Sequence, residues 1–481
     1  MKIIFVNPVI RPQDPPFHIP FGIATLSRIA DQLGHEVGIL DLNAHRLGVD
    51  AFREELKDAD YKDTDVVGIG GLSSQYKFIK PLVPIIKQIR PDALLVAGNG
   101  FLTTLPEEIM KLLPQIDVGI IGEGERTFTE LLDVVDSKNF SRIKGLIYRE
   151  DGELVRTPYQ PLIEDLDKEV PWPHWDMLPL EIYFQFSANL MGPASPPELQ
   201  RSRRRMSIVT ERGCPRQCTF CQHLGMSARD LSKIYGQPIK GPAVRFHSAK
   251  YVVDMVKHLR FKYQVDFVSI LDENFLANKK RAHEIADLWE QEDLAGLVHF
   301  GVLGDVASAD YELLQRLKDV GLTYVSYGGE VASDRLLKEI KKFTTVKQTQ
   351  SAIDATMKAG ITPIVTYMTG YPTEKIEDII ATVEFWKKNM AVVNPFFLQP
   401  YPGTKLFLDN RDKIIKQHGD IEHFLLSLGD ATDFSVNISP WSDVELLGLR
   451  QLMLAQDLDR IRKFGESKGL LPKREDDHGK A

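Results

Sequence analysis

The stretch Glu211–His223 reads Glu-Arg-Gly-Cys-Pro-Arg-Gln-Cys-Thr-Phe-Cys-Gln-His, and it contains every cysteine of the chain: Cys214, Cys218 and Cys221. Their spacing is CxxxCxxC, and cysteine thiolates are the usual ligands of iron–sulfur clusters. A four-iron cluster normally takes four such ligands, so three cysteines leave one iron open for chemistry. Gly213 and Pro215 favour an irregular loop, which can wrap around a cuboidal cluster. The stretch therefore predicts a 4Fe-4S cluster with one open iron.

Two other interpretations of the cysteines stay open at this point. A zinc site would need a fourth ligand, which His223 could supply, although structural zinc sites usually have paired ligand spacing. Three inert core cysteines are the simplest alternative, but free cysteines have no physical reason to gather at this spacing. Both alternatives explain less of the stretch than a cluster does.

The composition is that of an ordinary soluble protein. The chain has 481 residues, 43% of them hydrophobic and 26% charged, which is enough for two or three domains with separate cores. The net charge of -8 argues against a nucleic-acid-binding surface, and the one basic run, Arg201–Arg205, precedes a predicted strand. No apolar run approaches the roughly 20 residues of a membrane span, and the N-terminal run is too short for a signal peptide. Three clustered cysteines cannot form a disulfide framework, so we expect a cytoplasmic protein.

Residues 1–150 show alternating β and α patterns. Five short apolar runs, typical of buried strands, alternate with four helical patterns. The runs lie at Ile3–Val6, Glu36–Leu40, Val66–Ile69, Leu94–Ala97 and Val118–Ile121, and the helical patterns lie near residues 20–33, 75–89, 105–113 and 126–135. Continuous β-branched runs are typical of parallel sheets with helices on both faces. We therefore expect an α/β fold that begins with a doubly wound parallel-sheet domain.

Polar or glycine-rich segments follow each of these strands. Ligands of doubly wound sheets bind outside the carboxyl ends of the strands, and glycine there lets the backbone approach a flat ligand or a phosphate closely. Any one of these segments could be only a tight turn, but five on one rim favour a binding site. The candidate residues in them are Asn7, Asp41, His45, Ser73, Gly98, Gly100, Gly122 and Glu123.

A second series of strands and helices follows a proline-rich linker at residues 151–200. Its strand patterns lie at Met206–Thr210, Phe267–Leu271, His299–Leu303, Tyr324–Tyr327, Thr362–Tyr367 and Asn394–Gln399. Six strands with crossover helices predict a partial (β/α)6 barrel over residues 201–405, with its site at the carboxyl ends of the strands. Residues 406–481 predict a helical C-terminal region, with its clearest helix at Ser442–Lys463 and a charged end at Lys473–Ala481.

The cysteine stretch resembles the radical S-adenosylmethionine (SAM) superfamily, whose CxxxCxφC motif, with φ an aromatic residue, holds a 4Fe-4S cluster at the first strand of a partial barrel. Cys214, Cys218 and Cys221 match the three cluster ligands, and Phe220 matches the aromatic residue near the adenine. The resemblance implies that the open iron binds SAM and that an electron from the cluster cleaves it to methionine and a 5′-deoxyadenosyl radical. Later strand ends match the family as well. They imply that Asp272 and Glu273 bind the methionine amino group, and that further SAM contacts come from Glu330 and Gly370.

Residues 1–150 resemble the cobalamin-binding domain that precedes the radical SAM domain in one large subclass. The matching segments include Asn7-Pro8, Pro20-Phe21-Gly22 and Gly122-Glu123-Gly124-Glu125. The resemblance implies that the strand-end candidates named above contact cobalamin. Domains that bind cobalt through histidine use DxHxxG, whereas the spacing from Asp41 to His45 is longer. Members of this subclass commonly bind cobalamin without a histidine on cobalt, so the resemblance implies the cofactor and leaves the cobalt ligand open.

Three functions stay open. The first is methylation of an unactivated carbon in a small-molecule or lipid substrate, with methylcobalamin as methyl carrier and the deoxyadenosyl radical as hydrogen abstractor. The second is an oxidative cyclase or rearranging enzyme, like the anaerobic ring-forming enzymes of tetrapyrrole biosynthesis. The third is a non-catalytic iron–sulfur electron carrier. Because one cluster uses all three cysteines, we expect the electron to come from an external donor such as a flavodoxin or ferredoxin.

Overall fold

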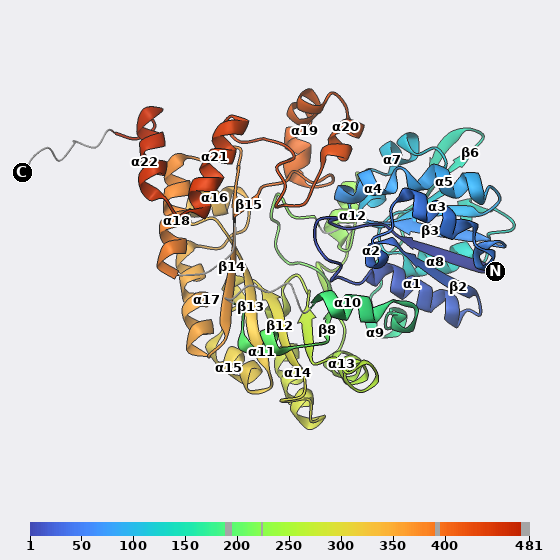
Figure 1. Ribbon diagram of the computed structural model, residues 1–481, viewed down its shortest axis with the longest axis horizontal. Helices are drawn as coiled ribbons and strands as arrows, with labels where there is room; N and C mark the ends of the chain where they lie inside the picture. The colour runs from blue at the N-terminus through green and yellow to red at the C-terminus, as the bar shows by residue number, and fades with distance from the viewer. Residues whose placement is uncertain (188–194, 223–224, 390–394, 473–481) are drawn as a thin grey trace, which may run out of the picture.

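The computed structural model describes residues 1–187, 195–222, 225–389 and 395–472. Figure 1 shows two α/β domains side by side, the N-terminal one in blue and cyan and the second in green to orange. Helices of the C-terminal region, in red, lie over one end of the second domain. Among them, α20 (Ile421–Ser427) reaches the N-terminal domain and contacts α4 (Tyr76–Ile79). The expected α/β fold with a helical C-terminal region is confirmed.

One sheet of seven strands, in the order β2-β1-β3-β4-β5-β6-β7, forms the N-terminal domain. Its five parallel strands lie where the sequence predicts them, at β1 (Lys2–Asn7), β2 (Glu36–Asp41), β3 (Val66–Gly70), β4 (Leu94–Gly98) and β5 (Val118–Ile120). Successive residues of a strand point to opposite faces, so Phe5 packs in one hydrophobic cluster and Ile4 in another. Both faces of the sheet are therefore buried.

Helices cover these two faces, as Figure 1 shows. On the face of Phe5 lie α1 (Phe21–Gln32) and α8 (Glu125–Leu132). On the face of Ile4 lie α3 (Val49–Lys57), α5 (Leu82–Ile89) and α7 (Pro106–Leu112). The short helices α2 (Leu42–His45), α4 and α6 (Asn99–Thr103) follow the carboxyl ends of β2, β3 and β4. The helix expected at residues 75–89 is thus two helices, α4 and α5.

An antiparallel hairpin that was not expected from the sequence extends this sheet. It consists of β6 (Leu146–Glu150), which pairs with β5, and β7 (Glu153–Arg156). Its turn is Asp151-Gly152, with φ values of 50° and 86°. Asp-Gly is favoured in two-residue turns of this kind because glycine adopts positive φ without strain. The N-terminal sheet is therefore mixed rather than purely parallel, and it runs to Arg156.

Six parallel strands in the order β8-β11-β12-β13-β14-β15 form the half-barrel of the second domain. They are β8 (Arg205–Ile208), β11 (Phe267–Ile270), β12 (His299–Gly304), β13 (Leu322–Glu330), β14 (Thr362–Thr369) and β15 (Phe396–Phe397). Strands that follow one another in the barrel series are neighbours in the sheet, which confirms the expected open barrel. The last strand is shorter than expected, and Asn394 lies outside the described residues.

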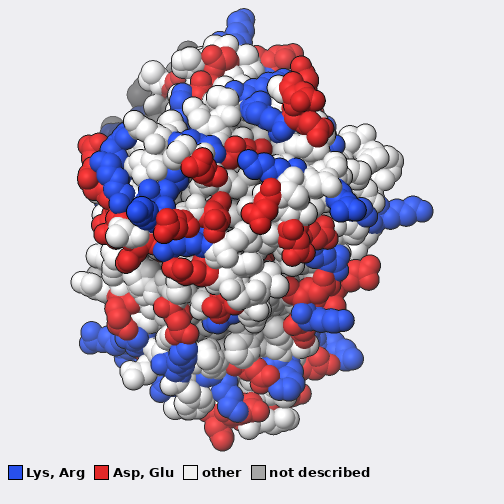
Figure 2. Space-filling model, turned by 90° about the vertical axis from the view of Figure 1, so that its right-hand side faces the viewer, with Lys and Arg blue, Asp and Glu red and all other residues white. Residues whose placement is uncertain are grey.

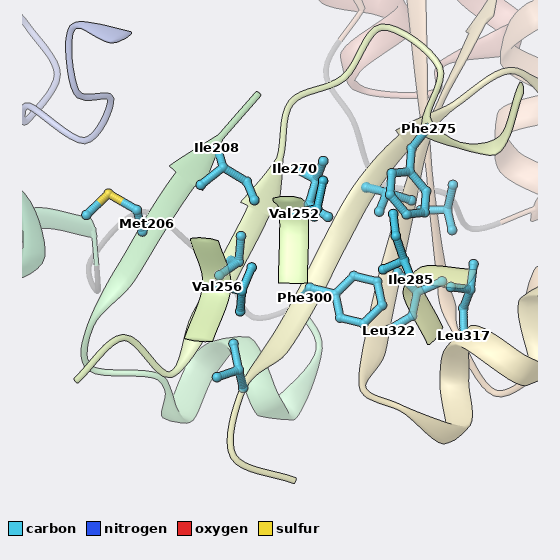
Figure 3. Packing of buried hydrophobic residues seen from close by; sticks show 14 of the residues in the cluster. Met206, Ile208, Val252, Val256, Ile270, Phe275, Ile285, Phe300, Leu317 and Leu322 are labelled. Atoms are coloured by element: carbon cyan, nitrogen blue, oxygen red, sulfur yellow. The ribbon is translucent and has the colours of Figure 1, made fainter. Parts of the chain in front are cut away.

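The outer face of the half-barrel packs against its helices. These are α13 (Ala249–Tyr263), α14 (Lys279–Gln291), α15 (Tyr311–Asp319), α16 (Asp334–Glu339), α17 (Val346–Lys358) and α18 (Ile376–Asn389). Figure 3 shows Ile208 of β8 and Ile270 of β11 beside Val252 of α13, within one buried cluster. Because side chains alternate along a strand, the residues next to Ile208 and Ile270 face the inside of the half-barrel.

Three regions outside the two sheets complete the fold. A two-stranded antiparallel ribbon follows β8 and consists of β9 (Glu211–Gly213) and β10 (Val244–Phe246). In the sequence, α12 (Ala228–Tyr235) lies between these two strands. The linker contains α9 (Leu166–Glu169), α10 (Leu180–Ser187) and α11 (Pro197–Arg201). The C-terminal region contains α19 (Lys405–His418), α20, α21 (Asp443–Leu454) and α22 (Leu458–Ser467). The ribbon was not expected from the sequence.

The helix expected at Ser442–Lys463 is two helices, α21 and α22. Gln456, between them, has a φ of 52°, and the Asp457 side chain accepts a hydrogen bond from the Arg460 backbone N–H at 3.0 Å. An aspartate cap of this kind starts a new helix. Lys473–Ala481 lie outside the described residues, and none of the described helices is both long and apolar enough to cross a bilayer.

Figure 2 shows the face of the molecule that the N-terminal domain presents. Acidic and basic side chains are interspersed over this face, and white patches separate them. The mixture agrees with the modest net charge of -8.

Candidate active site

The three cysteines lie in the loop between β9 and α12, just beyond the carboxyl end of β8. All three are half-buried and none forms a disulfide. Burial raises the pKa of Cys214 to about 11 and that of Cys218 to about 12, so both thiols are protonated near neutral pH in the metal-free protein. Such thiols give up their protons when they ligate iron, because the metal charge favours the thiolate.

Among the residues that the structure describes, no three His, Cys, Asp or Glu side chains converge as the ligands of a single zinc ion would. His223, the possible fourth zinc ligand, lies outside the described residues.

Asp272, expected to bind the methionine amino group, anchors the start of the cysteine loop. It is fully buried, and its carboxylate accepts hydrogen bonds from the backbone N–H and hydroxyl of Thr210 and, at 3.1 Å, from the Glu211 N–H. Arg281 supports the same point by donating to the Thr210 hydroxyl at 2.6 Å. The SAM contact expected for Asp272 stays a prediction. Burial raises the pKa of Cys221 well above its usual value, and the charge of the exposed Glu273 raises it further.

The rest of the cysteine loop is tied to strand ends across the half-barrel. The Arg216 guanidinium binds both carboxylate oxygens of Asp305 after β12, at 3.0 and 2.6 Å. The Thr219 N–H donates to the Ile340 carbonyl at 2.9 Å, and the Thr219 carbonyl accepts from the Leu406 N–H at 2.8 Å. Phe220 is half-buried and packs against the hydrophobic cluster that both domains share. Neither Arg216 nor Asp305 was expected from the sequence as a site residue. Arg216 lies between two of the predicted cluster ligands, and Asp305 follows a predicted strand.

Glu330 and Lys342 form a buried ion pair beside the cysteine loop. Lys342 Nζ donates to Glu330 Oε1 at 2.7 Å, and both side chains are about nine-tenths buried. Glu330 has a φ of 61° at a bulge of β13, a conformation that a non-glycine residue keeps only when its surroundings enforce it. Burial acts to lower the pKa of Lys342, but the charges of Glu330 and Cys218 outweigh it and raise the pKa. Lys342 was not expected from the sequence.

Glycine at position 328 leaves room for this ion pair. A Cβ at Gly328 would lie 2.3 Å from Glu330 Oε1 and 2.7 Å from Lys342 Nζ, so any larger residue would force the ends of this ion pair to move. The glycine-glutamate element at the end of β13 therefore suits the packing of the two charges. The sequence pattern pointed to this element, and the structure supplies its physical reason.

Gly370 lies in a turn held by a buried carboxylate. Glu374 Oε2 accepts hydrogen bonds from the Gly370 N–H and the Thr369 hydroxyl, each at 3.0 Å, and from Trp441 Nε1 at 3.1 Å. Gly370 has a φ of 98°, and a Cβ there would approach Leu446 of α21 to 3.4 Å. The turn thus joins the half-barrel rim to the C-terminal helices, and the SAM contact expected for Gly370 stays a prediction.

Glu374→Gln is expected to remove a pH dependence of stability. Burial raises the pKa of Glu374 from its usual 4.5 to about 7. Between these pH values the folded protein keeps a proton that the unfolded chain has lost, so the free energy of unfolding falls as pH rises. The decrease from this group amounts to about 3 kcal/mol by neutral pH. Urea unfolding of both proteins below and above this window checks the difference, with exposed Glu377→Gln as control; equal pH dependence in wild type and Glu374→Gln would contradict it.

Asn7 and Asp41 bind each other at the rim of the N-terminal sheet. Asn7 Nδ2 donates to Asp41 Oδ1 at 2.7 Å, and the Tyr183 hydroxyl of α10 donates to Asp41 Oδ2 at 2.7 Å. Both rim residues are buried, so they fix the linker against the strand ends. His45, four residues after Asp41, ends α2 and is exposed. Cobalamin contacts at these three residues stay predictions.

The remaining rim residues come together around α6. The hydroxyls of Ser73 and Thr104 lie 3.3 Å apart, and the Gly122 N–H donates to the Thr103 hydroxyl at 3.2 Å. Gly98 ends β4 and leads into Gly100 of α6. The structure thus gathers Ser73, Gly98, Gly100 and Gly122 at one edge of the sheet.

Glu123, also expected at the cobalamin site, points to the second domain. Its two carboxylate oxygens accept from Arg212 at 2.8 Å, from Arg245 at 2.9 Å and from the Ile163 N–H at 2.9 Å. With both oxygens engaged, the side chain is part of the domain interface. The cobalamin contact expected for Glu123 stays a prediction.

A cavity of about 600 Å³ opens beside the same rim. Segments after β1 and β2, together with α4 and α5, line it mainly with apolar side chains, including Val9, Leu42, Leu47, Phe78 and Leu82. None of the described rim residues expected to contact cobalamin lines this cavity. The glycine-rich rim itself lets the backbone approach a large flat cofactor closely, and three half-buried thiols on one anchored loop fit a cluster.

Residues 208–385 match the radical SAM superfamily, and the chain belongs to that superfamily. Residues 14–132 match the B12 binding domain family, so a cobalamin-binding domain precedes the radical SAM domain. Both resemblances drawn from the sequence are confirmed. The cofactors that follow are a 4Fe-4S cluster, SAM and cobalamin.

Curated relatives include two methyltransferases and a cyclase. An uncharacterized methyltransferase of Pyrococcus horikoshii, PH0819, is 30% identical over 81% of this chain and 77% of its own length. The cytidylyl-2-hydroxyethylphosphonate methyltransferase of Streptomyces wedmorensis is 25% identical over 84% of this chain and 80% of its own. The anaerobic magnesium-protoporphyrin IX monomethyl ester cyclase of Rubrivivax gelatinosus is 27% identical over 79% of this chain, and the match spans 64% of the cyclase.

Solved structures show the same fold. The radical SAM methyltransferase TsrM of Kitasatospora setae, with tryptophan and a SAM analogue bound, matches with a TM-score of 0.68 and 19% identity over 86% of this chain and 76% of its own. The cobalamin-dependent radical SAM enzyme OxsB, with aqua-cobalamin and SAM bound, matches with a TM-score of 0.65 and 16% identity over 100% of this chain and 63% of its own.

Proposed function

We propose that this protein is a cobalamin-dependent radical SAM methyltransferase that acts on an unactivated carbon of a small-molecule or lipid substrate. The observation that carries the proposal is that the strand-end rims of the two domains face each other. A Cβ at Gly403, after β15, would lie 3.0 Å from Thr104 Cγ2 at the end of α6. A Cβ at Gly225, after the cysteines, would lie 3.1 Å from Gly122 Cα. Methyl carrier and cluster would therefore share one interior space.

Some residues of the chain would bind the cluster, and others would orient SAM. When bound, the cluster supplies the electron that cleaves SAM, and cobalamin carries the methyl group. Cys214, Cys218 and Cys221 would hold the cluster. Glu330 and Lys342, which lie beside the cysteine loop, would contact the amino and carboxylate groups of the methionine moiety of SAM.

The inner face of the half-barrel is polar where a substrate would lie. Ser207 of β8 and Ser269 of β11 are direct neighbours that face inward, opposite the packed Ile208 and Ile270. The Tyr324 hydroxyl donates to Ser269 Oγ at 3.2 Å, and His18 Nδ1 lies 3.3 Å from Ser207 Oγ. These polar side chains favour a substrate that has hydrogen-bond donors or acceptors near the carbon that is methylated.

The electron source and the compartment belong to the same proposal. All three cysteines lie in one loop and are committed to one cluster, which supports an external one-electron donor such as a flavodoxin or ferredoxin. Their free state in the structure suits the reducing cytoplasm expected from the sequence.

Product analysis tests the proposed reaction. The anaerobically reconstituted protein, with hydroxocobalamin, a reductant and SAM carrying a deuterated methyl group, is incubated with the small molecules and lipids of a cell extract. We expect S-adenosylhomocysteine and 5′-deoxyadenosine in equal amounts and one extract component that gains the label. Deoxyadenosine and methionine without S-adenosylhomocysteine would instead indicate a cyclase or rearranging enzyme, and no SAM cleavage would indicate an electron carrier.

A further inference from the structure

Four buried charged side chains join the two domains directly before the cysteine loop, and we call them the interdomain ion cluster: Glu123, Glu125, Arg212 and Arg245. Arg212 Nη1 donates to Glu123 Oε1 at 2.8 Å and to Glu125 Oε2 at 3.2 Å, and Arg212 Nη2 binds Glu125 Oε1. Arg245 Nη1 donates to Glu123 Oε2 at 2.9 Å. Their side chains are only 4% to 14% exposed.

Each domain supplies one sign of charge to this cluster. Arg212 and Arg245 stand directly opposite each other on β9 and β10, an arrangement in which like charges repel. Glu123 and Glu125 follow β5 of the N-terminal sheet. Burial alone would raise the pKa of Glu125, but Arg212 holds it below its usual value. The four charges balance only when the domains are docked, since an unpaired buried charge is strongly unfavourable.

The Gly122–Glu125 loop contacts the chain on both sides of the cysteine loop. Before the cysteines, Arg212 binds Glu123 and Glu125 of this loop. The next residue, Gly213, has a φ of 88°, and a Cβ there would lie 2.2 Å from the Ala243 carbonyl, so it packs tightly against the segment before β10. After the cysteines, Gly225 packs against Gly122.

We propose that the interdomain ion cluster is a positioning device, which holds the cysteine loop in register with the cobalamin-binding rim and so couples SAM cleavage to methyl transfer. Arg212 is its central residue, because it touches both glutamates and lies two positions before Cys214. The inference rests on the proposed function for the methyl-transfer part, whereas the positioning part concerns the geometry of the two domains alone.

A charge-balanced double variant separates positioning from stability. Arg212→Met alone leaves Glu125 buried without its partner and is expected to destabilise the fold. Arg212→Met with Glu125→Met removes one charge of each sign, keeps the Glu123–Arg245 pair and restores apolar packing. Arg212→Lys keeps the charge but loses the two-pronged contact. Arg126→Met is the matched control, because Arg126 adjoins Glu125 in sequence but pairs with half-exposed Glu169.

Two measurements are made on the anaerobically reconstituted, cobalamin-loaded protein, and a third on the metal-free protein. Electron paramagnetic resonance reports the magnetic coupling between the reduced cluster and cob(II)alamin. Turnover with SAM and reductant reports 5′-deoxyadenosine and S-adenosylhomocysteine separately. Hydrogen exchange of the metal-free protein reports the protection of residues 122–132 and 211–216.

In the double variant we expect iron and cobalamin content and deoxyadenosine formation within about twofold of wild type, while S-adenosylhomocysteine formation falls about 100-fold. The cluster–cobalt coupling should weaken and both segments should exchange faster, with Arg212→Lys intermediate and Arg126→Met unchanged. Wild-type coupling and exchange in a folded double variant would overturn the positioning role; if that variant does not fold, wild-type coupling in Arg212→Lys would do the same. If the wild-type enzyme itself forms no S-adenosylhomocysteine, the proposed function fails, while coupling and exchange still decide the positioning role.

Discussion

Cys218→Ala is expected to abolish both the brown iron–sulfur absorbance and the cleavage of SAM. With two thiolates left, the loop holds too few ligands for a four-iron cluster with one open position. Because the radical reaction begins with an electron from that cluster, the loss should be complete rather than partial. Visible absorbance, iron content and deoxyadenosine formation after anaerobic reconstitution measure it.

Gln217→Ala is the matched control for this prediction. Gln217 adjoins Cys218 in the same loop but is exposed, so its substitution should leave cluster content and cleavage within about twofold of wild type. A Cys218→Ala protein that kept either the absorbance or the cleavage would contradict the assignment of Cys218 as a ligand.

Lys342→Met is expected to weaken SAM binding and to lower the rate of SAM cleavage by about 100-fold. The substitution removes the cation that lies between Glu330 and the cysteine loop, and it leaves the Glu330 carboxylate buried without its partner. Removing one partner of a buried pair costs about 3 to 5 kcal/mol, so a lower stability should accompany the kinetic loss. Equilibrium dialysis of SAM and the rate of deoxyadenosine formation measure the two effects.

The adjacent Lys341 provides the control, because it carries the same charge but is exposed. Lys341→Met should bind and cleave SAM like the wild type. Equal losses in both variants would mean that overall charge, and not the buried ion pair, controls SAM binding.

The parallel strands could be predicted because each is a short apolar run followed by glycine or a polar residue. The hairpin β6–β7 was missed although Asp151-Gly152 is a favoured turn, since its strands carry charged residues among the apolar ones. The ribbon β9–β10 has three residues per strand, too few for any periodicity. Strands this short are defined by their hydrogen bonds to the partner strand, and the pattern of a single segment does not show which partner it pairs with.

The site residues also divide into those with a recognisable local sequence pattern and those that only the fold brings together. The cysteines and Glu330 stand in recognisable local patterns, so sequence alone located them. Lys342 lies twelve positions after Glu330, beyond α16, and only the fold brings its ammonium back to the carboxylate. Asp272 and Glu123 lie at strand ends as the sequence predicts, but their hydrogen-bond partners, Thr210 and Arg212, could not be predicted, because only the fold brings them together.

The two backbone hydrogen bonds of Thr219 have a consequence for biosynthesis. The cysteine loop takes its shape from the Ile340 carbonyl and the Leu406 N–H, which belong to later parts of the chain. A ribosome exposes all three cysteines long before it has made Leu406. We therefore expect the cysteine loop to reach its final shape only once Leu406 has been made, and a chain truncated before Leu406 lacks one of the two hydrogen bonds that hold Thr219.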